Sequence, residues 1–346
     1  MPYRIAVLRR LALAAVLLAF TVVVFGAYVR LTAAGLGCPD WPGCYGHLTP
    51  AGAAAADAGS ADSPLHVGKA WREMIHRYLA STLGLLIVVI AVLSYLWRRA
   101  RALPLALPVG LVVLVVFQGL LGMWTVTLLL KPLIVTAHLA FGLTTLALLW
   151  WFWLSMRRLS TDPWSGTAAA VGGGSAAALM RPASPGLQRL GLVALAALVV
   201  QILLGGWTST NYAAVACPDL PTCQAQWWPE TDFRDAFVLW RGLGTNYEGG
   251  VLDHPARVAI HLTHRLGAIV ATLGLVIAAV VTLRRRDDRN SRWGAWALLC
   301  ALALQLMLGI GMVKLGFPLW LATAHNAGAA LLLLAALGFN RALRRA

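Results

Sequence analysis

The sequence predicts an all-α integral membrane protein in which eight transmembrane helices form two tandem, pseudo-symmetric four-helix bundles. Three observations support this prediction: an apolar composition, eight apolar runs of spanning length, and an internal repeat. Of the 346 residues, 60 % are hydrophobic and 12 % are charged, whereas soluble domains are about 45–50 % apolar and about 25 % charged. A soluble core of this size cannot hide so much apolar surface, so lipid is the expected solvent for most of the chain.

Apolar runs of spanning length recur along the whole chain. Lipid offers the backbone no hydrogen-bonding partner, so runs this long and this apolar cross it as helices. The first run follows a basic N-terminal segment and is long enough to span, so we expect a retained helix rather than a cleaved signal peptide. The expected helices cover residues 11–31, 74–97, 104–127, 133–155, 187–209, 258–283, 293–314 and 318–340.

The basic residues indicate the orientation of these helices. The net charge is +15, but the Lys and Arg side chains cluster at helix ends rather than along one face, which argues against nucleic-acid binding. The side of a membrane protein that is rich in Lys and Arg faces the cytoplasm. We therefore expect a multi-pass protein of the inner (plasma) membrane with both termini in the cytoplasm. The outer segments, 32–73 and 210–257, then face the periplasm or the cell exterior.

An internal repeat relates the two halves of the chain. Gly26 to Cys44 reads GAYVRLTAAGLGCPDWPGC, and it aligns without gaps with Gly205 to Cys223, which reads GGWTSTNYAAVACPDLPTC. Further matches pair Gln118, Gly122 and Thr136-Ala137-His138 with Gln305, Gly309 and Thr323-Ala324-His325. Both copies begin on the cytoplasmic side, as in a parallel repeat about an axis along the membrane normal.

The repeat predicts the domain organisation. We expect an N-terminal four-helix half over residues 1–158 and a C-terminal four-helix half over residues 187–346. The stretch between them, 159–186, is rich in Gly, Ala, Ser and Pro, a composition typical of a flexible linker. This linker would lie on the cytoplasmic side.

Four histidines open alternate spans at matched positions of the two halves: His76, His138, His264 and His325. Their spans all run from outside to inside, so the four imidazoles lie at similar depth. One such histidine could simply be hydrogen-bonded to a neighbouring helix, but four at matched positions indicate ligands. Two imidazoles per half are too few for a closed zinc site. Haem needs only axial ligands, because the porphyrin supplies the other four.

Charged residues flank the first histidine of each pair. Arg77 and Arg265 could bind haem propionates through bidentate hydrogen bonds. Alternatively, they could serve only to position the outer end of the helix. The sequence favours neither interpretation. Glu73 lies on the same helix face as His76, whereas its counterpart in the second half is His261. Taken alone, Glu73 is best interpreted as a solvated interfacial carboxylate. Its presence in one half only suggests that this half performs chemistry while the other holds a permanent cofactor.

Four of the five cysteines form two similarly spaced pairs, Cys38/Cys44 and Cys217/Cys223. Both pairs lie on the oxidising side of the membrane, where disulfides persist. The C-x5-C spacing does not match the usual C-x2–4-C spacing of zinc sites. Structural disulfides are the simpler interpretation, and redox-active disulfides that relay electrons are the alternative.

Taken together, these motifs resemble the haem A synthase family, in its bacterial type with paired loop cysteines. The resemblance covers nearly the whole chain and rests on the tandem halves, the two CPDxPxC loops, Glu73-x-x-His76-Arg77, His264-Arg265 and the two Thr-Ala-His sequences. It implies an oxidoreductase that converts the C8 methyl of haem O to the formyl group of haem A by successive hydroxylation. Haem A then serves terminal cytochrome oxidases.

The resemblance also implies roles for individual residues. His264 and His325 would ligate a retained haem b beside Arg265, and His76 and His138 would ligate or position the substrate haem O beside Arg77. Glu73 matches the outer-loop glutamate that the family needs for activity, and the cysteines match its disulfides, Cys38–Cys44 and Cys217–Cys223. The expected partners are haem O and membrane lipid, with haem O synthase and an unidentified electron donor as candidates. The oligomeric state, a homo-oligomer included, is left open.

Other classes of function use the same motifs. A quinol-linked di-haem cytochrome b would use all four histidines for electron transfer and would form no product. A thiol-oxidising protein would use the loop cysteines together with a quinone. A haem carrier would return its haem unchanged. The difference between Glu73 and His261 argues mildly against the symmetric cytochrome.

Overall fold

The computed structural model is almost entirely helical and describes residues 2–56, 59, 64–98, 105–161, 183–286 and 288–344. Within these residues, eight helices are long and apolar enough to cross a membrane, and no strand forms beyond two isolated bridges. This confirms the predicted all-α class. The eight helices are α1 (Pro2–Leu31), α3 (Val67–Trp97), α4 (Ala106–Thr127), α5 (Pro132–Thr161), α6 (Pro185–Thr210), α8 (His254–Arg285), α9 (Arg289–Lys314) and α10 (Leu319–Leu343).

Polar residues at the ends of the apolar runs set where several helices begin. Ser184 caps α6 by accepting a hydrogen bond from the backbone of Leu187, and Asp288 caps α9 in the same way through Ser291. These caps satisfy backbone N–H groups that a helix start leaves without partners. In the described parts of the connecting segments lie three short helices: α2 (Pro50–Ala55), the 3-10 turn η4 (Ala214–Ala216) and α7 (Phe233–Ala236).

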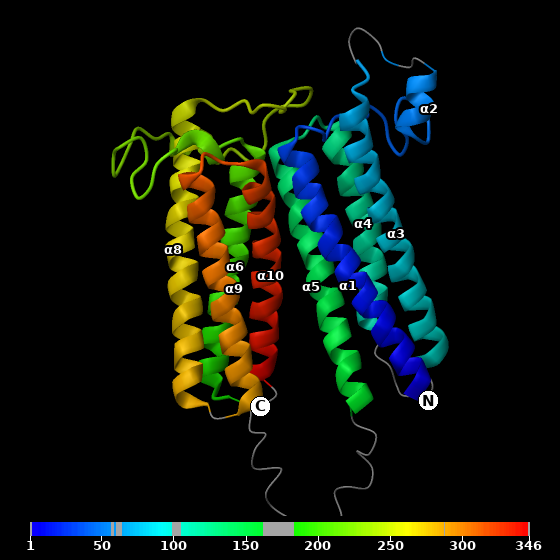
Figure 1. Cartoon of the computed structure of the whole chain (residues 1–346), viewed down its shortest axis with the longest axis vertical. Helices are drawn as coiled ribbons and strands as arrows, with labels where there is room; N and C mark the ends of the chain where they lie inside the picture. The colour runs from blue at the N-terminus through cyan, green and yellow to red at the C-terminus, as the bar shows by residue number, and fades with distance from the viewer. Residues whose placement is uncertain are drawn as a thin grey trace, which may run out of the picture.

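The eight long helices pack as two neighbouring sets of four (Figure 1). Helix α1 packs against α3 and α5 in the first set, which α4 completes, and α6, α8, α9 and α10 form the second. Each set has its own apolar core, built around Leu111 and Leu146 in the first and around Leu275 and Leu298 in the second. Large apolar side chains also point outward along the helices, as expected for surfaces that face lipid.

The two sets meet along a seam formed mainly by α1, α5, α6 and α10. Ala330, Leu333 and Leu334 of α10 belong to the core of the first set. Arg341 of α10 donates to the backbone oxygen of Trp151 in α5 at 3.2 Å. At the other end, Arg30 of α1 donates to the backbone oxygen of Ser209 in α6 at 2.7 Å. The seam therefore joins the two sets by packing along its length and by hydrogen bonds at both ends.

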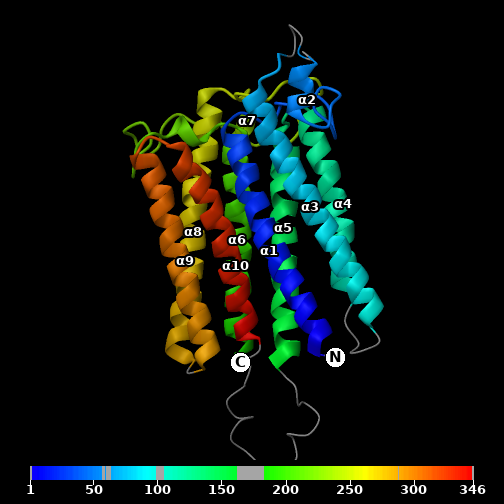
Figure 2. The ribbon, with the colours of Figure 1, turned by 45° about the vertical axis from the view of Figure 1, so that its right-hand side comes forward.

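Both termini lie at one end of the helices, and α2, α7 and the cysteine loops lie at the other (Figures 1 and 2). Most of the expected linker, residues 162–182, lies outside the described residues. Its final part is described: the backbone N–H of Ala183 donates to the carbonyl oxygen of Leu343 at 2.9 Å.

Candidate functional site

The structure brings His76 of α3 and His138 of α5 together inside the first helix set. Their ring centroids are 6.5 Å apart, with the ring planes at 78° to each other. Each ring lies against a glycine of a neighbouring helix. A Cβ atom added to Gly26 of α1 would lie 2.8 Å from Cε1 of His76, and one added to Gly122 of α4 would lie 3.4 Å from Cε1 of His138. The missing side chains make room for the imidazoles.

The second set repeats this packing. A Cβ atom at Gly205 of α6 would lie 3.1 Å from Cε1 of His264, and one at Gly309 of α9 would lie 3.0 Å from Cε1 of His325. The sequence repeat had already paired these glycines with Gly26 and Gly122. All four histidines therefore sit in equivalent niches between two helices.

The donor groups fit haem better than a bare metal ion. In the described part of the chain, no group of three or more His, Cys, Asp or Glu side chains is placed to hold a metal. Nδ1 of His76 and Nδ1 of His138 are buried and have no hydrogen-bond partner among the described residues. Metal–imidazole bonds are about 2 Å long, so two such bonds plus the ring half-widths come close to the 6.5 Å between the rings. A porphyrin iron needs only these two axial ligands.

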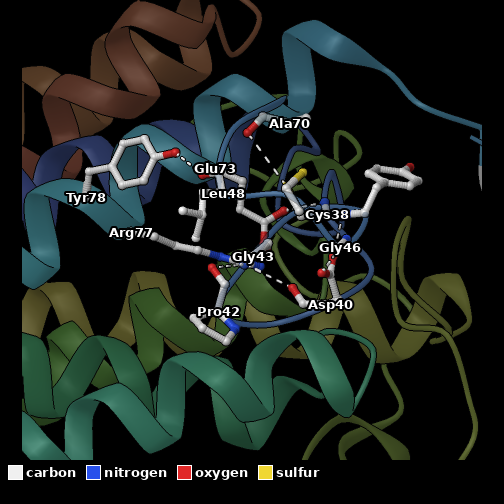
Figure 3. Close-up of a disulfide and its surroundings, with 12 residues drawn as sticks. Cys38, Asp40, Pro42, Gly43, Gly46, Leu48, Ala70, Glu73, Arg77 and Tyr78 are labelled. Atoms are coloured by element: carbon white, nitrogen blue, oxygen red, sulfur yellow. Dashed lines mark hydrogen bonds and ion pairs between the residues drawn. A yellow bond between two sulfur atoms is a disulfide. The ribbon is translucent and has the colours of Figure 1, made fainter. Parts of the chain in front are cut away.

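Glu73 of α3 is buried, with 4 % of its surface exposed. Its Oε2 atom accepts from the backbone N–H of Cys38 at 2.9 Å, and its Oε1 atom forms an ion pair with Arg77 one turn along the helix (Figure 3). The interpretation of Glu73 as a solvated interfacial carboxylate was wrong. The first outer segment folds back over α3 and shields the carboxylate from water.

The two arginines hold the cysteine loops. Arg77 donates to the carbonyl oxygens of Asp40, Pro42 and Gly43 at 2.9, 3.2 and 2.6 Å (Figure 3). Arg265 of α8 donates in the same manner to three carbonyls of the second loop, those of Cys217, Asp219 and Thr222, at 3.0, 2.8 and 2.8 Å. In this structure both guanidinium groups position the loops above the histidines. Contact with a propionate remains a proposal.

Both cysteine pairs are disulfide-bonded, Cys38 to Cys44 and Cys217 to Cys223. An aspartate organises each loop. Asp40 accepts from the backbone of Tyr45 and Gly46, and Asp219 accepts from the corresponding backbone in the second loop. The hydroxyl of Thr222, which donates to Asp219, lowers the pKa of this carboxyl below its ordinary value. The N–H groups of Ala225 and Gln224 act in the same direction.

His261 stands where the first half has Glu73. It is buried, and its Nδ1 atom lies 3.1 Å from the carbonyl oxygen of Ala213. The second half therefore offers a hydrogen-bonding imidazole at this point, and the first half offers a carboxylate.

Sequence reasoning missed two polar side chains, one half-buried beside a histidine and one buried at the outer end of the first set. Gln201 of α6 places its amide Nε2 atom 3.0 Å from Nδ1 of His264. Lys131, just before α5, is buried, and its ammonium donates to the carbonyl oxygen of Gly242 at 2.9 Å. A polar residue within or beside an apolar span was the available signal in both cases.

Residues 9–337 match the sequence model of the family described as cytochrome oxidase assembly protein, COX15-CtaA. The chain belongs to this family. Several relatives of this chain are named heme A synthase. That of Shewanella oneidensis is 41 % identical over 325 residues, which cover 92 % of this chain and 91 % of the relative. Those of Paracoccus denitrificans and Rhizorhabdus wittichii are 30 % and 28 % identical, and the alignments cover 89 % and 92 % of this chain and 80 % and 89 % of the relatives.

Membership of the COX15-CtaA family confirms the resemblance inferred from the motifs. The match runs through both helix sets, both cysteine loops and all four histidines. The family match therefore covers both halves of the chain rather than one half.

Proposed function

We propose that this protein is a haem A synthase, a multi-pass membrane oxidoreductase that converts the C8 methyl of haem O to the formyl group of haem A. Two successive hydroxylations, each a two-electron oxidation by an oxidant from outside the chain, give a geminal diol, which loses water. The observation that carries the proposal is the pairing of matched histidine niches with a carboxylate in one half only. The name and 41 % identity of the Shewanella relative support the same activity.

The two histidine pairs have different roles in this proposal. His76 and His138 ligate or position haem O, and His264 and His325 hold a resident haem b. A bound haem b supplies a redox-active iron within the same membrane protein. The four niches set the orientation of the imidazoles, because each ring is confined by a glycine on the neighbouring helix.

Glu73 is the proposed catalytic residue of the first half. Its burial and its two fixed partners, the Cys38 N–H and Arg77, hold the carboxylate near His76. It either accepts a proton released during methyl oxidation or orients the reacting edge of the substrate. The second half has no carboxylate there, since His261 occupies the place, and this fits a cofactor site.

Arg77 and Arg265 position the loop backbones and, in this proposal, also face the propionates. Guanidinium groups can serve a carbonyl and a carboxylate at once because they carry five donors. The Nε atom of Arg265 is buried and has no partner among the described residues, so one donor is available on the second half.

The proposed topology follows the charge distribution. Both termini lie at one end of the helices and the cysteine loops at the other, and the basic end would face the cytoplasm. The protein would then lie in the inner (plasma) membrane with its disulfides outside. Haem O is lipophilic and would enter from the bilayer, and haem O synthase and an electron donor are the proposed partners.

The test is to express the full chain with a supply of haem O and to identify the extracted haems by chromatography with mass detection. Haem A is expected from the parent chain and not from Glu73→Gln, with haem b retained in both. His261→Gln is the matched control and should still yield haem A. Unmodified haem b at two per chain, with no haem A from the parent, would contradict the proposal and support the di-haem cytochrome.

A further inference from the structure

In each of the four niches the imidazole lies against a glycine of a neighbouring helix. In only two of them does a glutamine amide contact the imidazole ring. Three of the niches carry a glutamine four residues before the niche glycine: Gln118, Gln201 and Gln305. In the second half, the Nε2 atom of Gln305 lies 3.3 Å from Nε2 of His325, and that of Gln201 lies 3.0 Å from Nδ1 of His264. In the first half, Gln118 reaches only the backbone oxygen of His138.

The contact between Gln201 and His264 leaves the iron-binding nitrogen free. It engages Nδ1, and the same amide also donates to the backbone oxygen of His264 at 2.9 Å. With the amide nitrogen in this place, it donates to unprotonated Nδ1 and to the carbonyl oxygen; with the amide rotated, Oε1 accepts from protonated Nδ1 and the bond to the carbonyl oxygen is given up. Gln305 instead faces Nε2 of His325, so an iron bound there would replace its contact.

Gly267 provides the space for the Gln201 amide. A Cβ atom on Gly267 would lie 2.3 Å from Oε1 of Gln201, which is closer than any two such atoms approach. Gly267 is three residues after His264 on α8. The glutamine and the glycine therefore form one unit: Gly267 leaves the space that Gln201 needs to contact His264.

The niche of His76, which is equivalent to that of His264, lacks this unit. Val22 stands four residues before Gly26, where the second half has Gln201, and Leu79 stands three residues after His76, where the second half has Gly267. Neither side chain can form a hydrogen bond. Nδ1 of His76 is accordingly buried without a partner among the described residues.

We propose that Gln201 is a positioning residue that fixes His264 as a permanent axial ligand, whereas His76, which has Val22 and Leu79 at the equivalent sequence positions, is the ligand that exchanges. A ligating histidine that donates its second ring N–H to an acceptor, here Oε1 of the rotated Gln201 amide, has its tautomer and orientation fixed and its basicity raised. Loss of such a partner typically costs about 10–100-fold in metal affinity. This inference rests on the proposed function and assigns the retained and the exchanging haem to particular residues.

The test measures haem transfer from the purified full chain to excess apomyoglobin, together with the electron paramagnetic resonance spectrum of the ferric haem. Gln201→Val and Gly267→Ala should each release the slowly lost haem at least about tenfold faster and shift its spectrum. Gln201→Glu keeps an oxygen that can accept from Nδ1, so this variant should release the haem as slowly as the parent chain does. The double variant Val22→Gln/Leu79→Gly should slow the release of the rapidly lost haem.

Release at the parental rate with an unchanged spectrum in both Gln201→Val and Gly267→Ala would overturn the inference. The haem A assay separates this failure from failure of the proposed function. If the parent chain makes haem A but release is unaffected, only the role of Gln201 is lost. If release changes as expected but no haem A forms, the positioning role stands and the synthase proposal fails.

Discussion

The two helix sets use the same loop clamp but surround their histidines differently. In each set an arginine next to a histidine donates to three carbonyls of a disulfide-closed loop. The first set adds the buried carboxylate of Glu73, and the second adds His261 and the amide of Gln201. The duplicated helix sets thus keep the same backbone arrangement at the site and differ in a few side chains beside the histidines. Those side chains are where a division of labour has to be sought.

The outer segment of the second half also crosses to the first. Besides its bond to Gly242, the ammonium of Lys131 lies 3.5 Å from the ring centre of Trp240. The backbone N–H of Tyr247 donates to the carbonyl oxygen of Leu129 at 3.0 Å. Where the first half has Lys131, directly before α5, the second half has Pro318 before α10. The second half therefore has no lysine at the position that makes this contact in the first half.

Removal of Arg77 or Arg265, the arginines that hold the cysteine loops, should give the largest difference in stability between the halves. Arg77→Ala leaves the buried Glu73 carboxylate without its charged partner, a change that costs about 3–5 kcal/mol when a buried ion pair is broken. Arg265→Ala removes only bonds to carbonyls and should be milder. Thermal unfolding in detergent measures both. The double variant Arg77→Ala/Glu73→Gln should recover part of the loss, and equal destabilisation by the two single variants would show that the halves do not differ here.

Removal of the disulfides should produce a smaller and more specific difference. Each closes a loop with a sequence separation of 6 residues, for which chain entropy predicts about 2 kcal/mol of stabilisation. Cys38→Ser/Cys44→Ser should lower haem A yield as well as stability, because the Cys38 N–H holds Glu73. Cys217→Ser/Cys223→Ser should lower stability with less effect on yield. Equal haem A yields from the two double variants would contradict the prediction, because they would show that the first loop does not affect the chemistry of Glu73.

Lys131→Met should loosen the crossing segment. The change removes a cation–π contact and a charge-assisted hydrogen bond, but it also removes the cost of burying a charge, so the net destabilisation should be about 1 kcal/mol. Limited proteolysis is the sensitive measurement, since residues 238–247 should become easier to cleave. Lys69→Met is the control, because Lys69 pairs with Glu248 at 3.6 Å and both side chains are about one-third exposed. Unchanged cleavage in Lys131→Met would show that Lys131 does not hold residues 238–247 in place.

The smallest effect concerns pH and the second loop. Because the folded-state pKa of Asp219 lies below its ordinary value of 3.8, its ionised form adds stability above about pH 4, and this contribution is lost as the pH falls through the lower folded value. Asp219→Asn should therefore flatten the acid side of the stability curve slightly. Urea titrations between pH 3 and 7 would measure it, and an identical pH dependence in the variant would exclude this contribution.

The membrane-spanning helices and their repeat could be predicted because apolar length and position are local properties of the sequence. The burial of Glu73 could not, since it depends on how the first outer segment folds over α3. Gln201 was hidden for a different reason. Its counterpart is Val22, so a comparison that looked for residues shared by both halves passed over it. The arginines were recognised, but their bonds to loop carbonyls required the loop backbone to be placed first.

The position of α10 bears on how the protein is assembled during synthesis. This helix follows the other seven membrane-spanning helices in the chain, yet its Ala330, Leu333 and Leu334 complete the core of the first set. A ribosome delivers α1, α3, α4 and α5 to the membrane well before α10 emerges. The part of the first core that these residues cover stays uncovered until α10 inserts, so haem loading into that set is expected to follow the insertion of α10.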